Sequence, residues 1–366
     1  MGSFSKLGNK IFIIIIRPEQ KKPRINSFVE NGINVVEIHP PNIGLKGKKG
    51  ISRYLSYLAC LPSVSKISSK IIKENQIDYV YSYMPGIGSS LPAIRSKSKH
   101  KVQYILDYAD LDVFIRPKRL LRKSIENANK IIAITEYLKN ILIERGVEKN
   151  KIIVVPNGVD LDLFDTSKIP VSEIQQLRNS FGASNLIFFV GSLQDLNMII
   201  NSALLVVKSV DDVKYVIIGD HRDPNRSKVV WEKKVSEKGL SNHFVFLGKK
   251  PREEIPKYLA CADICLDSFP DEPYYAAAHP IKLLEYGACG KPVVATRVAE
   301  TAKIIKHDEY GFLADPGNPE QYAKCIVELL NSKPLCEKFG KNFSAYVKDN
   351  FSWIKIASYL QKELSK

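Results

Sequence analysis

The chain has 366 residues, a length that favours two domains over a single core. Hydrophobic residues make up 45% and charged residues 25%, which is ordinary for a soluble globular protein. The formal net charge is +15, of which +13 falls in residues 1–170 and +2 in 171–366. This asymmetry predicts an anionic partner for the first half, either a membrane surface or nucleic acid, unless the lysines only solubilise it.

The cysteines and the apolar runs predict the cellular compartment of the protein. No two cysteines form a C-x-x-C pair, and several lie in apolar runs, so we expect reduced thiols, a cytosolic protein and no zinc site. The six are Cys60, Cys261, Cys265, Cys289, Cys325 and Cys336. The apolar run 11–16 is far shorter than the roughly 20 residues that span a bilayer, and no secretory cleavage site follows it.

The first half alternates strands with helices, which predicts a parallel sheet covered on both faces. The expected strands are 11–16, 33–38, 78–82, 101–106, 130–134 and 152–155. The expected helices are 24–31, 52–75 with a possible break at Pro62, 90–98, 118–128 and 136–145.

The alternation of strands and helices is interrupted over 161–182, where we expect the link between domains, and it resumes after that segment. The expected strands are 186–190, 214–218, 244–246, 264–267 and 292–295. The expected helices are 196–209, 228–238, 253–261, 281–288, 320–331 and 335–350, followed by a helical tail at 352–364. The fold class is therefore α/β, with two doubly wound domains.

The segment 279–296, HPIKLLEYGACGKPVVAT, reads as a short helix followed by a buried strand. Pro280 suits the first helical position, and Gly290 suits a left-handed stop. Lys282 and Glu285 share one helix face, so the ammonium could bind a phosphate at the helix N-terminus while the carboxylate accepts from sugar hydroxyls. The alternative is a Lys–Glu surface pair.

Five segments, taken together, carry a resemblance to one family. They are 131–164 (IIAITEYLKNILIERGVEKNKIIVVPNGVDLDLF), 188–193 (FFVGSL), 244–268 (FVFLGKKPREEIPKYLACADICLDS), 279–296 and 351–360 (FSWIKIASYL). From about Lys130 onward the chain resembles the GT-B-fold glycosyltransferases of the large retaining family 4. The resemblance implies an acceptor-side Rossmann-like domain at 1–165, a nucleotide-sugar-binding one at 166–350, and a C-terminal helix at 351–366 that crosses back.

The resemblance also implies roles for individual residues. The second Glu of the family's E-x7-E motif falls on Glu285, which would accept from the nucleotide ribose. The expected donor-binding residues are Gly191, Ser192, Gly248, Lys249, Lys250, Pro280, Ile281, Lys282 and Glu285. The expected catalytic residues are Glu285, Lys282, His279 and Asp110, the last because it follows a strand end on the acceptor side.

Three positions depart from the family pattern. The first Glu of E-x7-E is Ala277 here, the usual Arg of the diphosphate loop is Ser192, and its later Lys is Asn197. Asp110-Leu111-Asp112 spells D-x-D, a metal motif of other glycosyltransferase folds, but it lies away from the donor side, and we expect neither a metal nor another cofactor.

The sequence thus favours transfer of a sugar from a nucleoside diphosphate sugar to an acceptor, with retention of configuration. The acceptor is expected to be a lipid-linked saccharide or other glycan precursor at the cytoplasmic membrane face, with residues 1–170 on the anionic lipid. The alternative is a non-catalytic nucleotide-sugar-binding subunit. Nucleic acid is not an expected partner, because no basic motif interleaved with aromatic residues is present.

Overall fold

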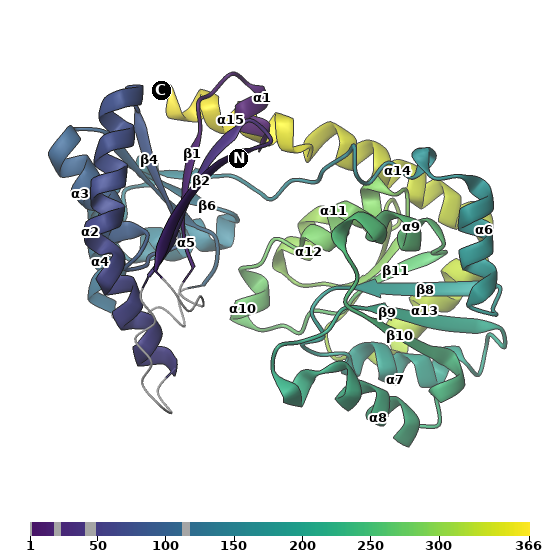
Figure 1. The fold of residues 1–366 in the computed structure, drawn as a ribbon. Helices are drawn as coiled ribbons and strands as arrows, with labels where there is room; N and C mark the ends of the chain where they lie inside the picture. Colours follow the sequence, from purple (N-terminus) through teal and green to yellow (C-terminus); the bar gives the residue numbers. More distant parts are fainter. Residues whose placement is uncertain (1, 18–22, 41–48, 112–117) are drawn as a thin grey trace. The chain divides into compact units, whose positions relative to one another are not determined.

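The computed structural model describes residues 2–17, 23–40, 49–111 and 118–366 (Figure 1). The chain divides into two compact units, Met1–Pro156 with Ile354–Lys366, and Asn157–Trp353. The division falls before residue 157, earlier than the boundary after residue 165 that we expected. Val159 and Phe164 are fully buried in the core of the second unit, so the linking segment packs there.

The second unit is built on a six-stranded parallel sheet in the order β10-β9-β8-β11-β12-β13. Its strands are β8 (Asn185–Val190), β9 (Val213–Ile218), β10 (Phe244–Gly248), β11 (Ile264–Asp267), β12 (Val293–Thr296) and β13 (Gly311–Ala314). Phe188 and Phe189, adjacent in β8, belong to different hydrophobic clusters. A parallel strand buried on both faces requires such a continuous apolar run, which is why the sequence revealed most of these strands.

Helices cover both faces of this sheet (Figure 1). They are α6 (Val171–Ser180), α7 (Asn197–Val206), α8 (Lys228–Glu237), α9 (Ile255–Ala260), α10 (Pro273–Ala276), α11 (Ile281–Ala288), α12 (Ala299–Ile304), α13 (Pro319–Leu330) and α14 (Lys333–Asn350). The short helices α10 and α12 and the edge strand β13 were not predicted. Each has only four to six residues, too few for a periodic pattern to stand out.

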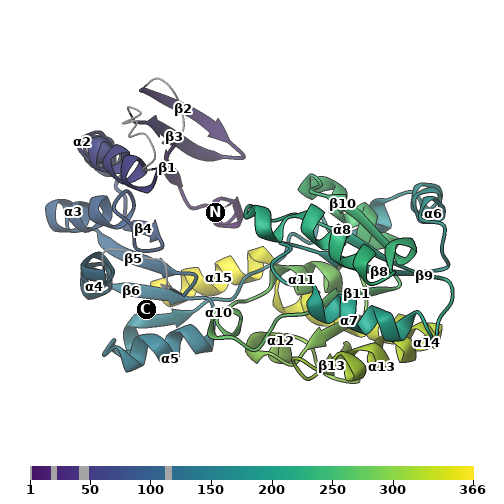
Figure 2. The ribbon, with the colours of Figure 1, turned by 90° about the horizontal axis from the view of Figure 1, so that it is seen from below.

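The first unit has its strands in two sheets. A parallel sheet has the order β4-β5-β6-β7, and a second sheet has the order β1-β3-β2. The strands are β1 (Phe12–Ile16), β2 (Arg24–Glu30), β3 (Ile33–His39), β4 (Tyr79–Tyr83), β5 (Gln103–Tyr108), β6 (Lys130–Ala133) and β7 (Ile152–Val154). The helices are α1 (Gly2–Lys6), α2 (Lys49–Asn75), α3 (Ser90–His100), α4 (Lys118–Asn127) and α5 (Glu136–Glu144). Figure 2 shows α2, α3 and α4 side by side.

The helix predicted at 24–31 is wrong, because this segment forms β2, paired antiparallel with β3. Asn31 and Gly32 both have positive φ, 50° and 75°, and join Glu30 to its partner Ile33. An Asn-Gly turn with two positive φ angles matches the twist of a β-hairpin. The predicted break at Pro62 is also absent, since α2 continues through that residue.

The C-terminal helix α15 (Trp353–Leu364) packs on the first unit after the chain leaves the second. Its Ile356 and Leu360 join a buried cluster with Ile105 and Ile132 of β5 and β6. The Tyr79 hydroxyl also donates to the Leu364 carbonyl oxygen at 3.0 Å. Within the described residues, no helix has the length and apolar character needed to cross a membrane.

Candidate functional site

The candidate site lies where the winding of the second unit's sheet reverses. The chain runs outward from β8 to β10 and then outward again, on the other side, from β11 to β13. β8 and β11 are therefore neighbours whose following loops lead away in opposite directions. In open α/β sheets this arrangement leaves a crevice at the carboxyl ends of the two strands, where ligands bind.

A pocket of about 150 Å³ is present at these strand ends. It is walled by the loop after β8, the loop after β11 and one side chain from α11. The lining residues are Phe189, Ser192, Gln194, Asp195, Ser268, Phe269, Pro270, Tyr275 and Lys282. The Tyr275 hydroxyl donates to Gln194 Oε1 at 2.7 Å, so α10 is tied to the loop after β8.

Lys282 projects from the first turn of α11 into this pocket. Its Nζ lies 2.8 Å from Oδ1 of Asp267, which is fully buried at the end of β11. The same nitrogen lies 4.4 Å and 4.6 Å from the ring centroids of Phe189 and Phe269. A cation between two ring faces beside a buried carboxylate is held in one place, because every alternative position loses these attractions.

Glu285 lies one turn along α11 and is 9% exposed. It does not pair with Lys282, so the alternative interpretation, a Lys–Glu surface pair, is wrong. Its Oε1 lies 3.0 Å from Nη2 of Arg252, whose guanidinium is over the Phe164 ring. Burial raises the pKa of the Glu285 carboxyl to about 7, although the Arg252 charge lowers it. Near neutral pH this carboxyl is poised between its acceptor-only and donor forms.

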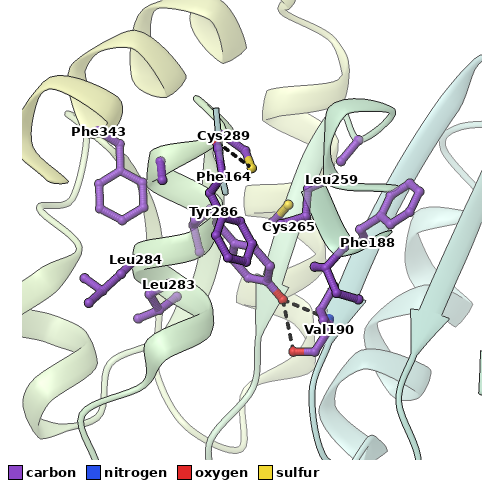
Figure 3. Close-up of a cluster of buried hydrophobic side chains, with 14 of the residues drawn as sticks. Phe164, Phe188, Val190, Leu259, Cys265, Leu283, Leu284, Tyr286, Cys289 and Phe343 are labelled. Carbon is purple, nitrogen blue, oxygen red and sulfur yellow. Dashed lines mark hydrogen bonds between the residues drawn. The ribbon is translucent and has the colours of Figure 1, made fainter. Parts of the chain in front are cut away.

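Tyr286 fixes α11 against the two central strands, and Figure 3 shows its hydroxyl at Val190, the end of β8. Its hydroxyl accepts from the Val190 N–H at 2.9 Å, and its own proton faces the Leu266 carbonyl oxygen at 3.3 Å. Val190 and Leu266 lie near the carboxyl ends of β8 and β11, the two strands between which the winding of the sheet reverses. One buried hydroxyl thus holds β8, β11 and α11 together, and it sets the position from which Lys282 and Glu285 project.

Gly191 opens the loop after β8 at φ +153°, and Gly219 follows β9 at φ +138°. A Cβ on Gly219 would lie 1.8 Å from the Gly191 carbonyl oxygen, so the two backbones touch. A Cβ on Gly191 would in turn lie 3.5 Å from the Lys282 Nζ. Ser192, the next residue, lines the pocket. The expected diphosphate loop and Lys282 are therefore brought together.

His279, Pro280 and Ile281 lead into α11. The helix begins at Ile281, as predicted, and Pro280 is its N-cap, with an extended backbone, and not its first helical residue. His279 is 6% exposed, faces the Phe351 ring, and its carbonyl oxygen accepts from the Asn157 amide at 2.8 Å. Burial lowers the pKa of its imidazole to about 4, so the ring is neutral at physiological pH.

Gly248 ends β10, and Lys249 and Lys250 follow it, two strands from β8 at the same edge of the sheet. Gly248 has φ +66°, and its carbonyl oxygen accepts from the Gly219 N–H at 2.9 Å. The Lys250 Nζ lies 5.6 Å from the centroid of the Tyr258 ring. Hydrogen bonds from backbone N–H groups lower the pKa of the Asp220 carboxyl most, and the nearby charge of Lys249 lowers it further.

Asp110 belongs to the first unit, just beyond β5. Burial raises the pKa of its carboxyl. Nearby Asp107, at the end of β5, accepts from the Tyr81 hydroxyl, and burial raises the Asp107 pKa to about 6. Asp112, the second carboxylate of the D-x-D motif, lies outside the described residues.

Two family models match the chain, one on each unit. Residues 171–345 match the model described as Glycosyl transferases group 1, and residues 8–163 match the model described as Glycosyltransferase Family 4. The chain belongs to the GT-B glycosyltransferases. An uncharacterized glycosyltransferase of Methanocaldococcus jannaschii is 28% identical to this one over 92% of this chain and 87% of its own length.

Two solved structures share the glycosyltransferase fold. The structure of HepE from Anabaena in complex with UDP has a TM-score of 0.72 and 20% identity, over 92% of this chain and 87% of its own. The sucrose-phosphate synthase of Thermosynechococcus elongatus has a TM-score of 0.74 and 18% identity, over 99% of this chain and 90% of its own. At this level of identity, the likeness concerns the fold.

The sequence analysis missed three residues that contact or line this glycosyltransferase's site. Asp267 could have been found, because it ends a predicted strand at the ligand-binding edge of the sheet. Arg252 lies in the segment 244–268, but nothing in that segment indicated that it pairs with Glu285, and Tyr275 lies in none of the segments that carry the resemblance. Ala277, where the family has a carboxylate, is fully buried, and Asn197 is the first residue of α7.

Proposed function

We propose that this glycosyltransferase takes its sugar from a nucleoside diphosphate sugar bound at the carboxyl ends of β8 and β11. The observation that supports this most directly is the Lys282 ammonium, held in the pocket beside the loop at Gly191 and Ser192. An ammonium and backbone N–H groups are the donors that a diphosphate needs. Glu285, one turn further on the same helix, would accept from the two ribose hydroxyls.

A uridine nucleotide is the first donor to test. HepE, which shares the fold, has been solved with UDP, with UDP and glucose, and with UDP-glucose. The sugar transferred by the present chain is a separate question, because the buried Ala277 offers no carboxylate to sugar hydroxyls.

Retention of configuration is part of the proposal. In a front-face reaction, the leaving phosphate oxygen takes the proton of the acceptor hydroxyl as the new glycosidic bond forms. The protein then contributes orientation of the two substrates and stabilisation of charge on the departing diphosphate. Lys282 and the backbone of the loop after β8 would supply that stabilisation without a metal ion.

The test is a calorimetric screen of UDP-, GDP- and ADP-sugars, followed by an assay for hydrolysis or transfer. We expect at least one of these sugar nucleotides to bind and to be hydrolysed slowly in the absence of acceptor. In the transfer product, the glycosidic linkage should have the same anomeric configuration, α or β, as the donor. Binding without any turnover would instead favour a non-catalytic nucleotide-sugar-binding subunit, the alternative suggested by Ala277. Absence of binding by any of the three classes would refute the donor site.

We also propose that the first unit binds an anionic membrane and takes a lipid-linked acceptor. The basic loop that we propose for this role, with Lys46, Lys48 and Lys49, lies outside the residues whose side chains are described. Along α2, however, Tyr54 and Leu58 are 41% and 37% exposed, which supports an interfacial segment more than a core one. Asp107 and Asp110 would be available for acceptor hydroxyls.

Liposome sedimentation tests the membrane proposal. The protein should sediment with vesicles that contain anionic lipid, and replacing Lys46, Lys48 and Lys49 with Glu should abolish this. The matched control makes the same change at three exposed lysines of the second unit, Lys333, Lys338 and Lys341, and should leave binding nearly intact. Equal loss in both variants would show that overall charge, not this loop, attracts the lipid.

A further inference from the structure

The donor pocket is short of positive charge for a diphosphate. Of the described residues that line it, only Lys282 is cationic, and the buried Asp267 carboxylate at 2.8 Å neutralises that charge. Asp195 also lines the pocket and adds a negative charge. Across the face of α11, Arg252 is likewise paired, with Glu285. A diphosphate carries about two negative charges, and bringing it to these groups requires a further cation.

Lys234 of α8 places an ammonium at the same loop. Its Nζ donates to Oδ1 of Asn197, the first residue of α7. The backbone N–H of Asn197 donates in turn to Oδ1 of Asp195, at 2.7 Å. Asn197 therefore links the Lys234 ammonium, through two hydrogen bonds, to the side chain of Asp195, which lines the pocket.

The aromatic side chain one turn before Lys234 directs it toward this loop. The Trp231 indole N–H donates to the Leu193 carbonyl oxygen at 3.0 Å, so the ring is fixed against the segment after β8. The Lys234 Nζ lies 5.5 Å from the centroid of that ring. Because Trp231 is 6% exposed, this packing is built into the contact between α8 and the loop.

The neighbouring lysines of α8 are paired, whereas Lys234 is not. Lys228 forms an ion pair with Glu232 at 3.3 Å, and Lys233 forms one with Glu237 at 3.7 Å. Among the residues that the structure describes, no carboxylate forms an ion pair with Lys234, and its ammonium contacts a neutral amide and an aromatic ring. Its charge is therefore available to an anionic ligand.

We infer that Lys234 is a donor-binding residue, which supplies the second positive charge to the diphosphate of the nucleotide sugar through the start of α7. In the free protein the Asn197 amide oxygen orients the ammonium. When the diphosphate binds, the ammonium donates to a phosphate oxygen, in place of or in addition to Asn197. The inference rests on the proposed donor site. It identifies a cation that no sequence motif marks, because α8 reaches the loop only in the folded chain.

The test compares the dissociation constants of UDP and uridine by calorimetry in Lys234→Met, which keeps an apolar stem over Trp231. We expect the affinity for UDP to fall about tenfold and that for uridine to change less than about twofold, since only UDP carries the phosphates. The matched control is Lys233→Met, one residue away on the same helix, which should bind both ligands as the wild type does.

A charge swap then separates a lost charge from a disturbed fold. Asn197→Lys in the Lys234→Met background returns an ammonium to the loop from α7, and we expect it to recover UDP affinity to within about threefold of the wild type. Equal losses for UDP and uridine, no loss at all, or no recovery in the swap would overturn the inference while leaving the donor site intact. A wild-type protein that binds no nucleotide would overturn both.

Discussion

Replacing Lys282 with Met should destabilise the second unit substantially, because it leaves the Asp267 carboxylate buried without a counter-ion. Asp267 is fully buried, and its remaining side-chain partner is the Thr301 hydroxyl at 3.3 Å. Removing one partner of a buried ion pair typically costs about 3–5 kcal/mol. For a unit of this size each kcal/mol lowers Tm by about 2–4 °C, so we expect a fall of about 6–20 °C.

Thermal unfolding followed by tryptophan fluorescence measures this effect, because Trp231 and Trp353 both lie in the second unit. The matched control is Lys257→Met, which removes the exposed ion pair to Glu173 at a nearly equal distance of 2.9 Å. Exposed pairs contribute about 0–1 kcal/mol, so this variant should melt close to the wild type.

The double variant Lys282→Met/Asp267→Asn should recover most of the lost stability, since Asn leaves no buried charge and can still accept from Thr301. It should nevertheless bind UDP more weakly while binding uridine nearly as well as the wild type. A single variant that melts like the wild type, or a double variant no more stable than the single one, would refute the buried-pair reasoning. Equal effects on UDP and uridine would show that Lys282 does not contact phosphate.

Three further predictions concern the same unit. Glu285→Ala should weaken donor binding by about 2–4 kcal/mol. In the wild type, donor affinity should rise with pH through about 7 as the carboxylate forms, and a flat affinity profile would contradict this. The contribution of Glu285 to the free energy of unfolding should fall as the pH rises from about 4.5 to 7, because burial raises the pKa of its carboxyl in the folded state. Gly219→Ala should abolish UDP binding by calorimetry because its Cβ meets the Gly191 carbonyl oxygen, whereas Gly182→Ala, with no atom within 4 Å, should bind normally. Tyr286→Phe should cost about 1–3 kcal/mol in chemical unfolding by leaving a buried strand N–H unpaired, and an unchanged midpoint would remove that hydroxyl from the framework.

Local pattern was sufficient for five of the six described strands of the second unit and for most of its helices, although α6, α10, α12 and β13 were missed. Its strands are buried on both faces, so each had to be a continuous apolar run, as in Leu186–Val190, and the helices between them follow from the alternation. The same reasoning failed at 24–31, where the turn residues Asn31 and Gly32, and not the preceding segment, carried the information. The positions of Lys282 and Glu285 on one helix face were also predictable from their spacing.

Only the tertiary structure decided which charges meet. Spacing along α11 allowed Lys282 to pair with Glu285, but the fold gives each a different partner, Asp267 and Arg252, from distant parts of the chain. The link from Lys234 to Asn197 has the same origin. Helical and strand periods determine which side chains share a face, whereas the partner that a buried charge finds depends on how strands and helices are packed against each other, and no local pattern records that packing.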